Sequence, residues 1–117
     1  MLHFYVRMID LRSAPPTAAQ PRVSMYDWRI IEFDERSALV GFLENSLTCR
    51  WTTEIVSIDL PAREVRTQSG RLYELFGPPA TEPDRLAVIA VRVTASVHSP
   101  WLDITAPVWT AMCEVTA

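Results

Sequence analysis

The chain has 117 residues, a formal net charge of −3 at pH 7 and a pI of about 5.3. Hydrophobic residues make up 49% and charged residues 21% of it, which is typical of one globular domain and not of a disordered chain. An acidic chain has no general attraction to nucleic-acid phosphates, and two cysteines form neither a disulfide framework nor a four-ligand metal site. We therefore expect one small domain with no cofactor and no metal.

The first 25 residues are expected to stand apart. Residues 1–12 alternate weakly between apolar and polar side chains, which suits an arm or an edge strand. Residues 13–25 hold three prolines among small and polar residues, so they predict a linker. Arg7 interrupts the opening apolar run, and no window has the length of a membrane-spanning helix. We predict a single domain at 26–117 in a cytoplasmic protein.

Short antiparallel strands are predicted for the middle of the chain. Residues 27–33 and 38–43 form a hairpin around a polar loop of about four residues, and Gly41 indicates a bulge or a close backbone approach. In the next strand Leu47, Cys49 and Trp51 are expected to face the core and Thr48, Arg50 and Thr52 to face water. Three further strands are predicted at 55–58, 64–67 and 72–76. This pattern predicts a meander of five or six strands, with a partial barrel as an option.

One or two helices are predicted after the paired prolines at 78–79. Thr81 resembles an N-cap with a proline in the first turn, and the apolar spacing is helical at Leu86, Ile89, Ala90 and Val93. The β-branched residues of this run leave a buried strand open for 84–95. Thr105 followed by a proline predicts a second, terminal helix. The fold class is therefore α+β.

No pattern of catalytic residues stands out. The histidines are His3 and His98, and Cys49 lies on the predicted core side of its strand, where a buried structural role is favoured. An enzyme that uses Cys49 or His98 stays open as an alternative.

Two surfaces are candidates for binding. The residues Arg50, Arg66 and Arg71, with Tyr73, could form a basic and aromatic face for nucleic acid, although glutamates on the same strands favour cross-strand ion pairs. Trp101 follows Ser-Pro in a predicted loop and has no periodic reason to be buried. Since tryptophan is enriched at interface hot spots, we predict a protein-binding surface at Trp101, His98 and Asp103.

These features favour a non-catalytic protein-binding domain that acts by occluding its partner. Small size, acidity and surplus aromatic residues suit an inhibitor encoded by a phage or other mobile element, of the anti-CRISPR kind, whose partner is another protein such as a nucleic-acid-processing effector complex. The alternatives are a small β-domain that binds nucleic acid through the arginine face, and an enzyme with an unrecognised site. Direct contact with nucleic acid or a membrane is not expected, and a homo-oligomer stays open.

Overall fold

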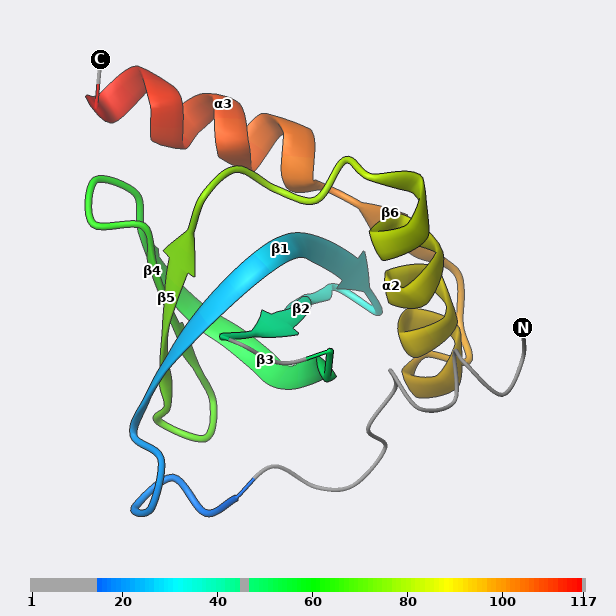
Figure 1. Cartoon of the computed structure of the whole chain (residues 1–117), viewed down its shortest axis with the longest axis horizontal. Helices are drawn as coiled ribbons and strands as arrows, with labels where there is room; N and C mark the ends of the chain where they lie inside the picture. Colours follow the sequence, from blue (N-terminus) through cyan, green and yellow to red (C-terminus); the bar gives the residue numbers. More distant parts are fainter. Residues whose placement is uncertain (1–14, 45–46, 117) are drawn as a thin grey trace.

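A computed structural model describes residues 15–44 and 47–116 of the chain. The described residues form six strands, β1 (Arg22–Phe33), β2 (Arg36–Leu43), β3 (Cys49–Asp59), β4 (Glu64–Thr67), β5 (Leu72–Phe76) and β6 (Trp101–Asp103). They also form the helices α2 (Pro83–Ser96) and α3 (Thr105–Thr116) (Figure 1). The predicted α+β class is confirmed, and the helix is the correct alternative for 84–95.

The strands form a closed ring. Each of β1 to β4 pairs antiparallel with the strand that follows it, which confirms the predicted meander. The ring closes because β5 also pairs with β1, and this pairing is parallel, with Arg22 opposite Leu72 and Tyr26 opposite Phe76. Strand β6 adds to β1 at one end. The sheet is therefore mixed, and its five strands close into a ring instead of the partial barrel that was one option.

Strand β1 begins before the predicted domain boundary. It starts at Arg22, so residues 22–25 lie in the sheet although their composition indicates a linker. All four pair with β5, which lies far away in the sequence, and Met25 also pairs with Leu43 of β2. Local composition carries no sign of the pairing with β5. The predicted arm or edge strand at 1–12 lies outside the described residues.

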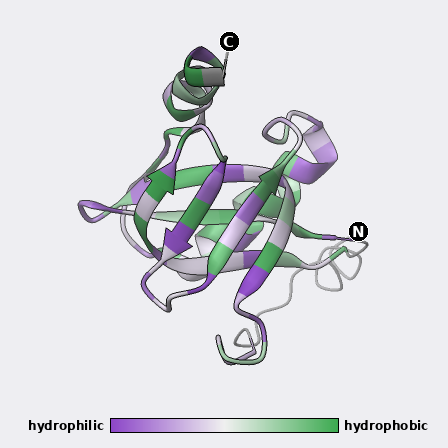
Figure 2. Cartoon of the chain, turned by 90° about the vertical axis from the view of Figure 1, so that its left-hand side faces the viewer, coloured by the Kyte–Doolittle hydropathy of each residue, from purple (hydrophilic) through white to green (hydrophobic). Residues whose placement is uncertain are grey.

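Two hydrophobic clusters lie on opposite faces of β1. Beneath α2, the first cluster contains Ile31, Val40, Phe42, Cys49, Ala80, Val88, Ile89, Val93 and Val97. The second joins the strands to α3 and contains Val23, Met25, Trp28, Ile30, Leu39, Val65, Tyr73, Leu75 and Met112. Adjacent residues Ile30 and Ile31 belong to different clusters, so both faces of β1 are buried here. In other parts of the sheet, hydrophobic residues (green) and hydrophilic residues (purple) alternate along the strands (Figure 2).

A β-bulge bends β1 in its middle. Tyr26 pairs with Phe42 and Arg29 pairs with Val40, so Asp27 and Trp28 together lie opposite Gly41. A Cβ atom at Gly41 would stand 2.8 Å from Cγ of Met25 and 3.0 Å from Cα of Trp28, and the second contact is the close backbone approach that was one of the two options predicted for this glycine. Asp27 has a φ of 45°, a left-handed conformation that aspartate tolerates better than most residues. The bulge buries Trp28 and leaves Asp27 half-exposed beside α2.

Three local predictions are corrected. The loop between β1 and β2 has two residues and not four, since Phe33 pairs with Arg36 across a turn made by Asp34 and Glu35. In β3 and the segment before it, Leu47 is 55% exposed and Thr52 only 4% exposed, the reverse of the expectation. The cause at Thr52 is an extra residue in β3 between the pairs Ala38–Glu54 and Val40–Trp51, which changes which side chains face inward.

The helix N-termini also differ from the prediction. Glu82, and not Thr81, is the N-cap of α2, and its side chain makes no capping hydrogen bond. Pro83 occupies the first helical position, as predicted. Thr105 is the first residue of α3, and its hydroxyl accepts a hydrogen bond from the backbone N–H of Ile30 at 2.8 Å. The threonine therefore ties α3 to β1.

Candidate functional site

Trp101 is exposed, as expected, but it lies in a strand and not in a loop. In β6 it pairs with Phe33 of β1, while Leu102 pairs with Glu32. Trp101 is 38% exposed and Leu102 is 62% exposed. Two large apolar side chains thus stand in solvent on a three-residue strand whose single partner, within the described chain, is β1.

Carboxylates surround these apolar side chains. A shallow hollow of about 230 Å³ lies between the β1–β2 turn and β6, and its acidic lining residues are Glu32, Asp34 and Glu35. Both turn residues have positive φ, 48° for Asp34 and 61° for Glu35, a conformation that costs a non-glycine residue about 1 kcal/mol or more. We call Trp101, Leu102 and the three carboxylates the β6 edge.

The turn is held to the segment before β6. The Ser99 hydroxyl donates a hydrogen bond to Oδ2 of Asp34 at 2.9 Å, and Nη2 of Arg36 lies 3.8 Å from the same oxygen. The Arg36 guanidinium also lies 5.0 Å from the centroid of the Phe33 ring. Turn, loop and edge strand therefore form one continuous surface.

Asp103 and His98 have different environments from Trp101. The Asp103 carboxylate accepts hydrogen bonds from Nε of Arg29 and from the backbone N–H of Thr105, each at 2.9 Å. Burial raises the pKa of Asp103, but these hydrogen bonds outweigh it and lower the pKa below its usual range. Asp103 is thus engaged in joining β6, β1 and α3, whereas His98 is exposed between α2 and β6.

The four residues of the predicted basic face do not form an open face. Arg71 is 4% exposed and Tyr73 is 2% exposed, so neither can offer a free surface to a base or a phosphate. Nε of Arg71 donates to the carbonyl of Gln20 at 2.7 Å, and Nη1 of Arg50 donates to the side chain of the same glutamine at 2.9 Å. Arg66 is exposed and donates to the carbonyl of Gly70.

The expected ion pairs exist with a different arginine. Glu64 and Glu74 face each other across β4 and β5, and Nη1 of Arg22 lies 3.2 Å from the first carboxylate and 2.6 Å from the second. Arg22 comes from β1, which joins these strands only through the parallel pairing. No local pattern in the sequence places it there.

Cys49 is buried, which agrees with the structural role that the sequence favoured for it. It is fully buried in the cluster under α2, and burial raises its pKa to about 12, despite opposing effects of Arg92 and Arg85. At neutral pH the side chain is a protonated thiol and a poor nucleophile.

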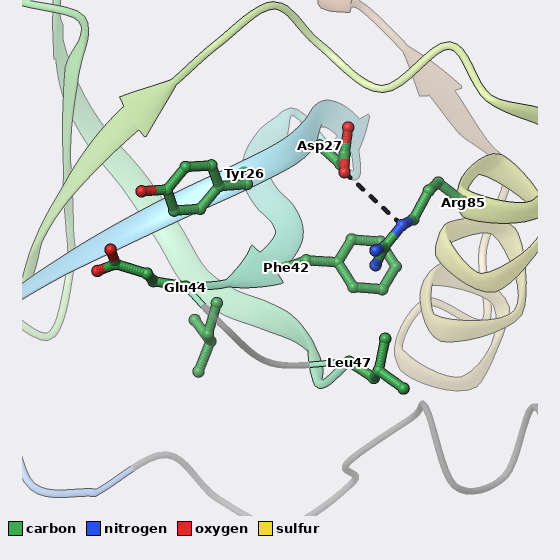
Figure 3. A pocket seen from close by; sticks show the side chains of 7 residues that line it. Tyr26, Asp27, Phe42, Glu44, Leu47 and Arg85 are labelled. Carbon is green, nitrogen blue, oxygen red and sulfur yellow. Dashed lines mark ion pairs between the residues drawn. The ribbon is translucent and has the colours of Figure 1, made fainter.

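A second hollow, a groove of about 460 Å³ beside the bulge, has no counterpart among the sequence-based predictions. Figure 3 shows its lining side chains, which come from β1, the end of β2, the segment before β3 and the first turn of α2. They include Tyr26, Asp27, Phe42, Glu44, Leu47 and Arg85. We call this the Asp27 groove.

Opposite charges meet at one end of the Asp27 groove. Nε of Arg85 lies 3.6 Å from Oδ2 of Asp27, and the guanidinium carbon lies 4.2 Å from the centroid of the Phe42 ring (Figure 3). Toward the other end, partial desolvation and the neighbouring Glu44 carboxylate raise the pKa of Tyr26. The Tyr26 ring stacks on Phe76 at 5.3 Å. Gly41 indicates the bulge, but no sequence signal joins Asp27 to Arg85.

Known proteins give no guide to this arrangement. No protein-family model matches the chain, and neither a curated protein nor a solved structure matches it. Among the described residues, no three His, Cys, Asp or Glu side chains are grouped so as to hold a metal ion. Neither of the two helices described is long and apolar enough to cross a membrane.

Proposed function

We propose that the chain is a non-catalytic protein-binding domain and that the β6 edge is its contact surface. The observation that carries this proposal is the exposure of Trp101 and Leu102 on an edge strand next to three carboxylates. An exposed tryptophan with an apolar neighbour is typical of the residues that dominate binding energy at protein interfaces.

Charge indicates the chemistry of the partner. Glu32, Asp34 and Glu35 are all exposed, and Asp34 and Glu35 form the β1–β2 turn. The nearby Arg36 offsets part of their negative charge. Such a surface is complementary to basic protein surfaces and repels phosphates. The partner is therefore a protein that presents arginine or lysine around an apolar contact.

The specific form of this proposal is an inhibitor that covers the basic, nucleic-acid-binding surface of an effector complex. Proteins that bind nucleic acid carry such surfaces because they must neutralise phosphates. An anti-CRISPR-like protein encoded by a mobile element would act in this way, by occlusion and without catalysis. The buried, protonated Cys49 supports the non-catalytic form.

The test uses a panel of purified nucleic-acid-processing effectors, including CRISPR nucleases, with cleavage and direct binding as readouts. We expect the chain to inhibit an effector, and Trp101→Ala to weaken binding by about tenfold or more. Leu102→Ser should weaken binding, whereas Val56→Ser should not, because Val56 is an equally exposed strand residue, at 64%, on β3.

The inhibitor form of the proposal and the β6 edge as its contact surface can be disproved independently of each other. If no effector is bound or inhibited, the inhibitor form is wrong. If an effector is bound but Trp101→Ala and Val56→Ser bind it equally well, the β6 edge is not the contact surface.

A further inference from the structure

The Asp27–Arg85 pair in the Asp27 groove has unused hydrogen-bonding capacity. Its 3.6 Å separation is an ion-pair distance and is too long for a hydrogen bond. Nη1 of Arg85 is buried, and no described residue accepts a hydrogen bond from it. A charged donor that is removed from water without an acceptor is costly, so a bound group that supplies the acceptor would be favoured.

A carboxylate next to a guanidinium is complementary to a group that both donates and accepts hydrogen bonds. In an extended peptide, the N–H and the C=O of one residue point in the same direction. Such a residue can donate its N–H to Asp27 and accept from Arg85 with its C=O.

The rest of the groove selects among peptides. Leu47, 55% exposed, and the half-buried Tyr26 provide apolar contacts, with Tyr26 toward the Glu44 end of the groove (Figure 3). Glu44 adds a second carboxylate on the far side (Figure 3). With Asp27 and Glu44 against Arg85, the lining carries one excess negative charge, which favours a cationic side chain.

We propose that the Asp27 groove binds a short extended peptide segment in which an apolar residue stands next to lysine or arginine. Asp27 and Arg85 hold the backbone of the apolar residue, and Glu44 pairs with the basic side chain. This site goes beyond the proposed function, because it is built from β1, β2 and α2 and includes no residue of the β6 edge.

The experiment is an NMR titration of the ¹⁵N-labelled full chain with capped tripeptides. Acetyl-Lys-Leu-Ala-amide is the expected ligand, and acetyl-Glu-Leu-Ala-amide is the charge-reversed control. We expect the lysine peptide to shift the backbone amides of Tyr26, Asp27 and Leu47 and the Nε–H of Arg85, and the glutamate peptide to bind about tenfold more weakly or not at all.

Matched variants test the roles of Arg85 and Asp27. Arg85→Gln and Asp27→Asn should each weaken binding about tenfold, and asparagine still tolerates the positive φ at position 27. Arg36→Gln is the control, because Arg36 also stacks on a phenylalanine and pairs with an aspartate, but outside the groove. The amide spectrum of each variant shows whether its fold is intact.

Several results would overturn the proposal. They are the absence of shifts at millimolar peptide, equal affinity for the two peptides, or equal weakening by Arg85→Gln and Arg36→Gln. Trp101→Ala should bind the peptide as the unmodified chain does, so loss of the β6-edge function and loss of the groove are distinguishable.

Discussion

The same three residue types meet at two places in this protein with different results. In the Asp27 groove, Arg85 stacks on Phe42 and pairs with Asp27, and in the β1–β2 turn, Arg36 stacks on Phe33 and pairs with Asp34. Both aspartates have positive φ, 45° in the groove and 48° in the turn. The arrangements differ in burial, since the Arg85 side chain is 26% exposed and that of Arg36 is 51% exposed.

This difference in burial decides what each cluster can do. Water satisfies the exposed Arg36 and screens its ion pair, so the carboxylates of the turn cluster stay open to solvent at little electrostatic cost. The groove cluster is partly removed from water, and Nη1 of Arg85 is buried there without an acceptor among the described residues, which is the basis of the proposed peptide site. The same three residue types thus suit the proposed recognition surface in one place and the proposed peptide groove in the other.

Removing the two aromatic rings should give the largest contrast between the clusters. Phe42 is 2% exposed within the cluster beneath α2, so Phe42→Ala should lower the free energy of unfolding by about 4 kcal/mol. Phe33 is only partly buried, so Phe33→Ala should cost less than about 2 kcal/mol. Urea unfolding of both variants measures the difference. Equal losses would show that the clusters do not differ in burial as described.

Disrupting the β-bulge in β1 should affect the Asp27 groove and should not affect the β1–β2 turn. Gly41→Ala forces a Cβ atom against Met25 and the backbone of Trp28, so we expect a loss of about 2 kcal/mol and displacement of Asp27. Gly70→Ala is the control, since it has a positive φ but open space around it, and should cost about 1 kcal/mol. Urea unfolding gives the energies. A Gly41→Ala variant as stable as the original chain would argue against close packing at the bulge.

Relieving the strained turn should have the smallest effect and the opposite sign. Glu35 has a φ of 61°, which glycine adopts without penalty, so Glu35→Gly should raise the free energy of unfolding by about 1 kcal/mol. Thermal unfolding, read as an increase in Tm, measures this gain. A decrease would mean that the Glu35 side chain makes a stabilising contact that outweighs the strain.

Sequence periodicity predicted the local elements well and the long-range ones poorly. The spacing of Leu86, Ile89 and Val93 correctly predicted α2, because a helix is held by contacts between neighbours in sequence. The parallel pairing of β1 with β5 depends on strands that are remote in sequence, so it had no local signature. The burial of Tyr73 and Arg71 follows from closure of the ring and from the segment around Gln20, which the strand pattern does not encode.

The candidate sites show the same division. Exposure of Trp101 could be predicted because no apolar period includes it. The Asp27 groove could not, because its charged pair joins a bulge in β1 to the first turn of α2. A bulge also explains why simple alternation failed at Thr52, since one additional residue exchanges the two faces of a strand.

Closure of the ring by its first and last strands sets an order on folding during synthesis. Among the described strands, β1 leaves the ribosome first, but one of its edges acquires its β5 partner only when β5 has been made. Until then this edge is open to pairing with other nascent or misfolded chains. Formation of the long-range β1–β5 contacts should therefore limit the folding rate, and the chain is most vulnerable to aggregation just before the ring closes.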